Sequence, residues 1–166
     1  MKITPSVFYN PAMPLKKIVI FGKGEAGKST FISTIIPDAI NVNHRGRTIA
    51  LDFGTYRHNG REFHFYGTPG QARFNCIRDI LALNAHHALM VFDASRPLEI
   101  TDSDILREIE GLSLPFFAIL NLKRGHKSPL SESDVSGICK DIPGYRGLFC
   151  GDVKDQGFVI SVLNAL

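Results

Sequence analysis

The sequence contains few cysteines, no long apolar run and no large excess of charge of one sign. Its 3 cysteines have no metal-ligand spacing, which favours a reduced, cytoplasmic chain over a disulfide scaffold. No stretch approaches the roughly 18 apolar residues of a transmembrane helix, and the N-terminus lacks the apolar core of a signal peptide. The 19 basic and 16 acidic residues leave a net charge of +3, which is too mild for a dedicated nucleic-acid-binding protein.

Length and composition are those of one ordinary globular domain. The chain has 166 residues, of which 44% are hydrophobic and 21% charged, so the disordered, collagen-like and coiled-coil classes are excluded. A chain of this size buries roughly 70% of its unfolded surface, enough for a core without disulfides or metals. Residues 1–15 include three prolines, Pro5, Pro11 and Pro14. We expect them to form an extended arm or an added edge strand ahead of one domain over 16–166.

Apolar runs rich in β-branched residues alternate along the chain with segments of helical spacing. The turn His-Asn-Gly at 58–60 predicts an antiparallel hairpin. Elsewhere, strands that alternate with helices predict a three-layer α/β fold: a mostly parallel six-stranded sheet with one antiparallel edge hairpin. The cap expected for the helix near residue 101 is Thr101 or Asp102. The expected strands are 16–21, 48–56, 61–66, 87–93, 115–120 and 148–150, and the expected helices are 29–36, 71–84, 101–110, 131–140 and 155–166.

Residues 22–29 match the phosphate-loop pattern G-x-x-x-x-G-K-S, between an expected strand and an expected helix. Glycines let successive backbone N–H groups point at phosphate oxygens, and the helix N-terminus adds its positive dipole. Lys28 would reach the β- and γ-phosphates, and the Ser29 hydroxyl would ligate Mg²⁺. The candidate nucleotide-binding residues of this segment are Gly22, Gly24, Glu25, Ala26, Gly27, Lys28, Ser29 and Thr30.

Two further segments resemble the switches of Ras- and Rab-like small GTPases. T-I-A-L-D-F at 48–53, 20 residues after Lys28, is similar to the first switch, which implies that Thr48 closes over Mg²⁺ and the γ-phosphate; an ordinary strand-opening threonine is the alternative. Gly67-Thr-Pro-Gly70-Gln71 resembles the second switch. The resemblance implies that the Gly70 N–H senses the γ-phosphate and that Gln71 is the catalytic residue that orients the attacking water.

F-Y-G-T-P-G-Q-A-R-F at 65–74 and V-F-D-A-S-R-P at 91–97 resemble a prokaryotic subgroup more closely. Its members are similar to the gliding-motility and polarity GTPases and to the β-subunit of the signal-recognition-particle receptor. The resemblance implies a P-loop domain over 16–166, with Mg²⁺ as cofactor and GTP or GDP as ligand.

The sequence departs from this family at two informative positions. Gly67 replaces the Asp that usually holds Mg²⁺ through water, and Asp52 on the neighbouring strand is the nearest carboxylate to replace it; a solvated Asp at a strand end is the alternative. The guanine-reading N-K-x-D segment is Asn121-Leu-Lys-Arg124 here. Asn121 is retained, Leu122 replaces the Lys that stacks on the base, and Arg124 replaces the Asp that accepts from guanine. Because an Arg cannot accept a hydrogen bond, we expect weakened discrimination against adenine. Asn121 and Lys123 are the candidate nucleotide-binding residues of this segment.

These features predict a small GTP-binding switch that hydrolyses GTP slowly with Mg²⁺ held by Ser29, Thr48 and Asp52. A degenerate GTPase-fold scaffold with little or no nucleotide binding is the main alternative, and a broad-specificity nucleotide hydrolase is another. A protein effector or activator is the expected partner, with a homodimer as a further possibility, and nucleic acid is not expected. The basic loop 123–127 either contacts an acidic partner, anionic lipid or RNA, or is simply solvated. Adjacent His86 and His87 cannot chelate one ion together and are expected to be structural.

Overall fold

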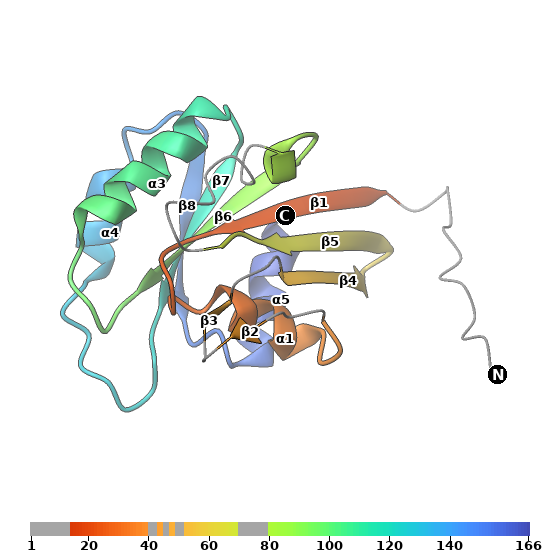
Figure 1. The fold of residues 1–166 in the computed structure, drawn as a ribbon, viewed down its shortest axis with the longest axis horizontal. Coiled ribbons are helices and arrows are strands. Elements are labelled where there is room, and N and C mark those ends of the chain that lie inside the picture. The colour runs from red at the N-terminus through yellow and green to blue at the C-terminus, as the bar shows by residue number, and fades with distance from the viewer. Residues whose placement is uncertain (1–13, 40–42, 45–46, 49–51, 70–79) are drawn as a thin grey trace.

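The computed structural model describes residues 14–39, 43–44, 47–48, 52–69 and 80–166. Within these residues, a six-stranded sheet of order β4-β5-β1-β6-β7-β8 forms the centre of the molecule, and β2 pairs with β3 separately (Figure 1). The strands are β1 (Leu15–Phe21), β2 (Asn43–His44), β3 (Arg47–Thr48), β4 (Asp52–His58), β5 (Arg61–Gly67), β6 (His87–Asp93), β7 (Phe116–Asn121) and β8 (Tyr145–Gly151). The helices whose bounds lie within the described residues are α1 (Lys28–Ile35), α3 (Ile100–Gly111), α4 (Glu132–Cys139) and α5 (Gln156–Ala165).

The strand directions confirm the expected α/β fold class. β1 runs parallel to β5 and β6, and the β6–β7 and β7–β8 pairs are parallel too. β4 is antiparallel to β5, so it forms the expected edge hairpin. Asn59 and Gly60 make its turn with φ of 48° and 71°, the pair of positive angles that a type I′ hairpin turn requires.

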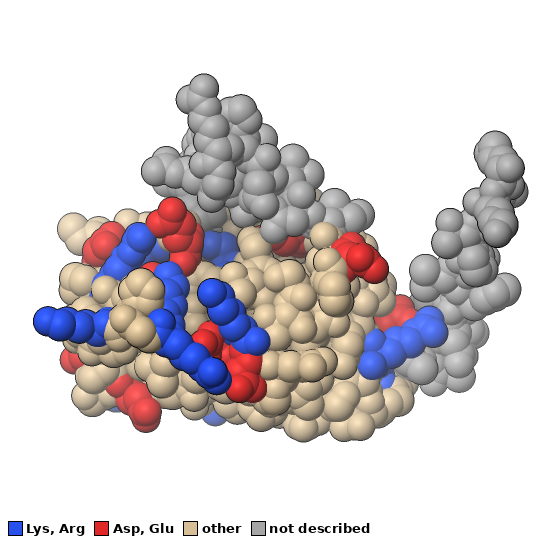
Figure 2. Space-filling model, turned by 90° about the horizontal axis from the view of Figure 1, so that it is seen from below, with Lys and Arg blue, Asp and Glu red and all other residues tan. Residues whose placement is uncertain are grey.

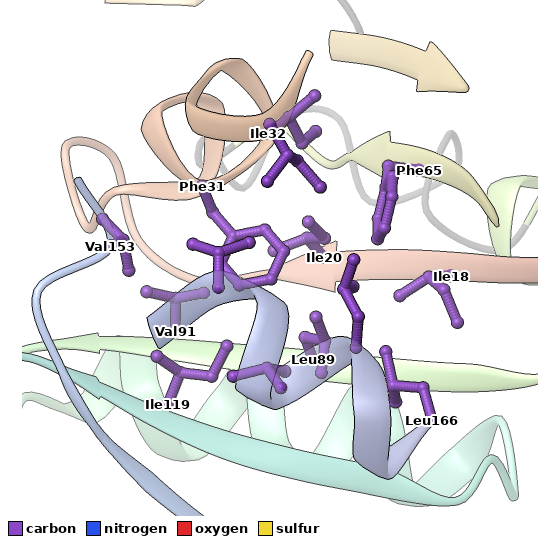
Figure 3. Close-up of a cluster of buried hydrophobic side chains, with 14 of the residues drawn as sticks. Ile18, Ile20, Phe31, Ile32, Phe65, Leu89, Val91, Ile119, Val153 and Leu166 are labelled. Carbon is purple, nitrogen blue, oxygen red and sulfur yellow. The ribbon is translucent and has the colours of Figure 1, made fainter. Parts of the chain in front are cut away.

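Side chains that alternate along the strands bury two apolar clusters, one on each face of the sheet. One cluster joins Ile18 and Ile20 of β1 to residues of α1 and α5, among them Phe31 (Figure 3). The other joins Val19 and Phe21 of the same strand to α3 and α4. Each helix pair therefore covers one face. At roughly 25 cal/mol per Å² of apolar surface removed from water, this burial is the main stabilising contribution to the fold.

The bounds of several elements differ from the expected ones. α3 has Glu99 as its N-cap, so the expected cap at Thr101 or Asp102 is wrong; Asp102 instead accepts a hydrogen bond from the Glu99 N–H at 2.9 Å. β8 extends over Tyr145–Gly151 rather than 148–150, because glycine at 147 with φ of 150° interrupts the apolar pattern without ending the strand. The expected strand 48–56 is divided between β3 and β4.

Some expectations fall on residues outside the described ranges. The arm over 1–15 is described only from residue 14, and β1 already begins at Leu15. Of the expected helix 71–84, residues 80–84 are described: 80–82 are helical, but 83 and 84 lie in a turn, so the helix ends at residue 82 and not at 84. In the described part of the chain, no helix combines the length and the apolarity needed to span a membrane.

Candidate nucleotide site at the carboxyl edge of the sheet

The phosphate loop runs from Gly22 to Gly27 and joins β1 to the start of α1. Gly22 and Gly27 have φ of 144° and 115°, a region that L-residues with side chains avoid. Space excludes a side chain as well: a Cβ at Gly22 would lie 2.6 Å from the Val91 carbonyl oxygen, and one at Gly27 would lie 2.5 Å from Asn121 Nδ2. The loop therefore packs tightly against β6 and β7 and leads directly into the N-terminus of α1.

Lys28, the first residue of α1, folds back into this loop. Its side chain is 7% exposed, and Nζ donates to the carbonyl oxygens of Gly22 and Lys23 at 2.8 and 2.6 Å. A buried ammonium beside the N-terminus of a helix gives a concentrated positive potential, which suits phosphate groups. Thr30, one turn into the helix, lines the adjacent pocket.

Ser29 and Asp52 meet directly beside the phosphate loop. The Ser29 hydroxyl donates to Asp52 Oδ2, and Asp52 is 2% exposed. Burial raises the pKa of Asp52, while the Ser29 hydrogen bond and the nearby Lys28 charge oppose that shift. Asp52 Oδ1 is buried without a hydrogen-bond partner, so one oxygen of this carboxylate is left for a ligand.

Gly67 lies directly across the β4–β5 hairpin from Asp52. A Cβ at Gly67 would lie 3.0 Å from Asp52 Oδ2 and 3.1 Å from Asp52 Cβ, tighter than ordinary contacts. The Asp52 side chain thus occupies the space that a side chain at 67 would need. A carboxylate is present at this edge of the sheet, supplied by β4 in place of β5.

The donor set at Ser29 and Asp52 fits a magnesium ion, which prefers carboxylate and hydroxyl oxygens. Among the described residues, no group of three or more His, Cys, Asp and Glu side chains forms a metal site alone. A Mg²⁺ ion here would therefore depend on phosphate oxygens and water for its remaining ligands, as is usual for nucleotide-bound Mg²⁺.

Asn121, the last residue of β7, fastens two loops to each other. Its Nδ2 donates to the Ala26 carbonyl at 2.9 Å, and its Oδ1 accepts from the Val153 N–H at 3.2 Å. Val153 is 1% exposed and anchors the loop after β8 in the core (Figure 3). The side-chain amide of Asn121 therefore links the phosphate loop to the loop after β8, with its nitrogen bonded to one loop and its oxygen to the other.

Lys123 lies two residues further along the chain and connects the phosphate loop to the end of β6. Its Nζ donates to the Glu25 carbonyl at 3.0 Å and to Asp93 Oδ2 at 2.6 Å. Burial opposes ionisation of Asp93, but the hydrogen bonds from Lys123 and Ser95 outweigh it and lower its pKa. Lys123 thus makes a charge-assisted hydrogen bond to the backbone of the phosphate loop.

The tip of the phosphate loop is fixed from outside by ion pairs. Glu25, with φ of 65°, projects outward and pairs with Arg96 at 2.7 Å. Lys23 pairs with the buried Asp102 of α3 at 2.9 Å. Sequence reasoning missed Asp93, Arg96 and Asp102. The available signal was that Asp93 ends a buried strand beside β1, where carboxyl ends of parallel strands gather.

A pocket of about 990 Å³ opens next to the phosphate loop. Its walls include Gly27 and Thr30 on one side and Arg124, Asp152 and Asp155 on the other. Arg124 Nε lies 3.5 Å from Asp152 Oδ2, and Arg124 Nη2 lies 3.5 Å from Asp155 Oδ2. The face in Figure 2 likewise shows lysine and arginine side chains interspersed with acidic ones toward the left, without a large patch of one sign.

The structure thus brings together the described site residues in two groups: Lys28, Ser29 and Asp52 around the phosphate loop, and Asn121 and Lys123 beside the pocket. Thr48 lies in β3, but its side chain is outside what the structure describes. Gly70 and Gln71 also lie outside the described residues.

Comparison with known proteins agrees with this geometry. A family model described as 50S ribosome-binding GTPase matches residues 17–122. An uncharacterized protein of Methanocaldococcus jannaschii is 30% identical over 84% of this chain and 88% of its own length. GTPase Der of Campylobacter curvus is 28% identical over 76% of this chain and 29% of its own length. Ras-related protein RABA5a of Arabidopsis thaliana is 34% identical over 49% of this chain and 38% of its own length.

The sheet order and the phosphate loop define a P-loop nucleotide-binding domain of the GTPase fold. The chain belongs to the family described as 50S ribosome-binding GTPase, and at this level it is a GTP-binding protein.

Proposed function

We propose that this protein is a small Ras-like switch that binds GTP with Mg²⁺ and hydrolyses it slowly. The observation that carries the proposal is the contact between the Ser29 hydroxyl and the buried Asp52 carboxylate beside the phosphate loop. Asp52 retains an oxygen without a hydrogen-bond partner, and such oxygens are ligands that Mg²⁺ takes from proteins. A site that can bind Mg²⁺ beside the phosphates supports hydrolysis of the nucleotide as well as its binding.

Each part of the site has a distinct role in this proposal. The N–H groups of 22–29 hold the phosphates, and Lys28 supplies a point charge to them. Ser29 and Asp52 hold Mg²⁺, which when bound neutralises charge on the phosphate oxygens. Following the resemblance, Thr48 and Gly70 sense the γ-phosphate and Gln71 orients water. Release of these contacts after hydrolysis would be the switch.

Base selectivity is proposed to be loosened. Arg124 stands where the family has a carboxylate that accepts from guanine, and an Arg has no acceptor. Loss of such a pairing costs a site much of its discrimination. We expect a GTP-over-ATP affinity ratio on the order of 100 or less. A protein effector or activator, a homodimer and a cytoplasmic location belong to the same proposal.

The role of Asp52 in holding Mg²⁺ is tested by removing its carboxylate from β4 and then placing a carboxylate at position 67 of β5 instead. Asp52→Asn is expected to weaken Mg²⁺ by about 10–100-fold, measured as the Mg²⁺ concentration that half-maximally slows GDP release. The φ of Gly67 is not positive, so the backbone at position 67 allows an Asp once the Asp52 side chain is removed. The double variant Asp52→Gly, Gly67→Asp should recover most of the Mg²⁺ dependence.

Gly67→Asp alone is the matched control, because it adds a carboxylate without removing the steric conflict with Asp52. Unchanged Mg²⁺ dependence in Asp52→Asn, with GDP still bound, would contradict the role given to Asp52.

The degenerate scaffold is the second candidate, and Arg124 is the observation that favours it. Mass spectrometry of the small molecules released from the purified, denatured protein separates the two. Bound GDP or GTP supports the switch. No nucleotide after purification, together with no titration of added GDP in Mg²⁺, would support the scaffold.

A further inference from the structure

The carboxylates and the Asn amide that line the pocket beside the phosphate loop are candidate acceptors for a base, and they are not equivalent. Asn121 uses both ends of its amide on Ala26 and Val153. The Glu25 carboxylate is exposed and turned toward Arg96. Only Asp152 and Asp155 remain as carboxylates on the wall opposite the phosphate loop.

Asp155 is committed to the fold. It is the N-cap of α5, where its Oδ1 accepts from the Phe158 N–H at 2.9 Å, and its side chain is 46% exposed. A half-exposed carboxylate competes with water for every donor it meets, so it discriminates poorly between bases. Asp155 is therefore a weak candidate for reading a base.

Asp152 is placed differently. Its side chain is 12% exposed, and the loop that carries it is fixed through Val153, which is buried and bonded to Asn121. Oδ1 accepts from the Lys154 N–H at 2.9 Å, which sets the orientation of the carboxylate. Each carboxylate oxygen has two acceptor sites, so Asp152 can accept further hydrogen bonds.

Arg124 provides the counter-charge for Asp152 but leaves the carboxylate able to accept further hydrogen bonds. The 3.5 Å separation from Arg124 Nε to Asp152 Oδ2 is an ion pair longer than a good hydrogen bond. The Arg124 side chain is 78% exposed, so a ligand can displace it at little cost. The loop after β7 thus holds the positive partner, and the loop after β8 holds the acceptor.

Resting on the proposed function, we infer that Asp152 is the specificity-determining residue that reads guanine, in place of the missing carboxylate at position 124. Guanine presents N1–H and N2–H₂ donors on one edge, and a fixed carboxylate accepts from both. Adenine has no donor at N1 and no amine at C2, so it cannot make these two hydrogen bonds to Asp152. Arg124 competes with the base for the same carboxylate, which keeps the preference for guanine moderate.

The experiment measures the affinities of GDP, ADP and xanthosine diphosphate for wild type and for Asp152→Asn by competition against a fluorescent nucleotide. An Asn presents N–H donors where the carboxylate only accepts, and xanthine has a carbonyl in place of the guanine amine. We expect the variant to lower the GDP-over-ADP ratio about tenfold or more and to raise the affinity for xanthosine diphosphate. A merely structural Asp152 would not produce that gain.

Asp155→Asn is the matched control, since it removes one charge from the same wall and keeps an N-cap side chain. It should change neither the ratio nor the binding of xanthosine diphosphate. Arg124→Ala should raise the GDP-over-ADP ratio several-fold by removing the competitor.

The outcomes separate this inference from the proposed function. A wild-type preference for GDP that Asp152→Asn leaves unchanged, or a wild-type ratio near one, overturns the inference while nucleotide binding stands. No binding of any nucleotide by the wild type overturns both.

Discussion

At the scale of single residues, the proposed site has two carboxylates, Asp52 and Asp152, each beside a position where the family motif has an Asp and this chain does not. Asp52 on β4 fills the space beside Gly67 of β5. Asp152, after β8, faces Arg124, after β7. In both pairs, we propose that a carboxylate on a neighbouring element replaces the one that the family motif has. A ligand responds to where a carboxylate lies and not to which strand carries it. A motif that is searched for along one strand alone therefore fails to identify such carboxylates.

A residue outside the site gives a prediction about pH. His87 begins β6, and burial together with the charges of Lys16, His86 and Arg146 lowers its pKa from the usual 6.5. The folded state therefore favours neutral His87, and the unfolded state binds the extra proton first. Stability from this group is present above pH 6.5 and is lost as pH falls below it.

The measurement is urea unfolding of wild type and His87→Leu at about pH 7.5 and about pH 5, a range in which histidine titrates. Leu fits the apolar surroundings beside Phe117 and should lose less stability on acidification than the wild type. His126→Leu, at an exposed loop position, controls for the removal of one histidine. An equal loss in wild type and His87→Leu would contradict the prediction.

At the scale of elements, the site depends on how strands end and helices begin. The strand, phosphate loop and helix over 15–35 were predictable because all of their signals are consecutive in the sequence. Asp93 and Arg96 were not predictable as partners of the loop. Their segments meet it only because the order β1-β6-β7-β8 brings these strand ends together, and no local pattern encodes that order.

The end of β8 shows how closely one element constrains the next. A Cβ at Gly151 would lie 2.3–2.7 Å from ring atoms of Phe158 in α5. Gly151→Ala must therefore displace this ring or the loop that carries Asp152. We expect a loss of about 1–3 kcal/mol in the free energy of unfolding and a weaker GDP affinity.

The matched control is Gly137→Ala in α4, where an added Cβ meets nothing within 4 Å. There, Ala should raise the free energy of unfolding by about 0.5–1 kcal/mol through helix propensity and leave GDP binding unchanged. Chemical unfolding and a GDP titration of both variants provide the comparison. If both variants changed the free energy of unfolding equally, the Phe158 ring would have to move aside without loss of stability, which would contradict the prediction.

At the scale of the whole molecule, the candidate nucleotide site lies at the carboxyl ends of four neighbouring strands, three from the middle of the sheet and the edge strand β8. β1, β6, β7 and β8 are hydrogen-bonded neighbours, and the loops that follow them are joined by Asn121 and Lys123. A ligand seated against these loops contacts segments that belong to both apolar clusters. We therefore expect nucleotide binding to stabilise the whole fold against unfolding.

This coupling predicts a thermal shift that depends on the base and on Mg²⁺. A ligand that binds only the folded state at 100 times its Kd adds about 2.7 kcal/mol, which for a chain of this size raises Tm by roughly 5–11 °C. GDP with Mg²⁺ should give the full shift by calorimetry. ADP at the same concentration should give a smaller one, because its affinity is lower. Lys28→Ala, which removes a charge-assisted contact of about 1.5–3 kcal/mol, should lose much of the GDP shift. A shift of the same size in Lys28→Ala and wild type would place nucleotide binding away from the phosphate loop.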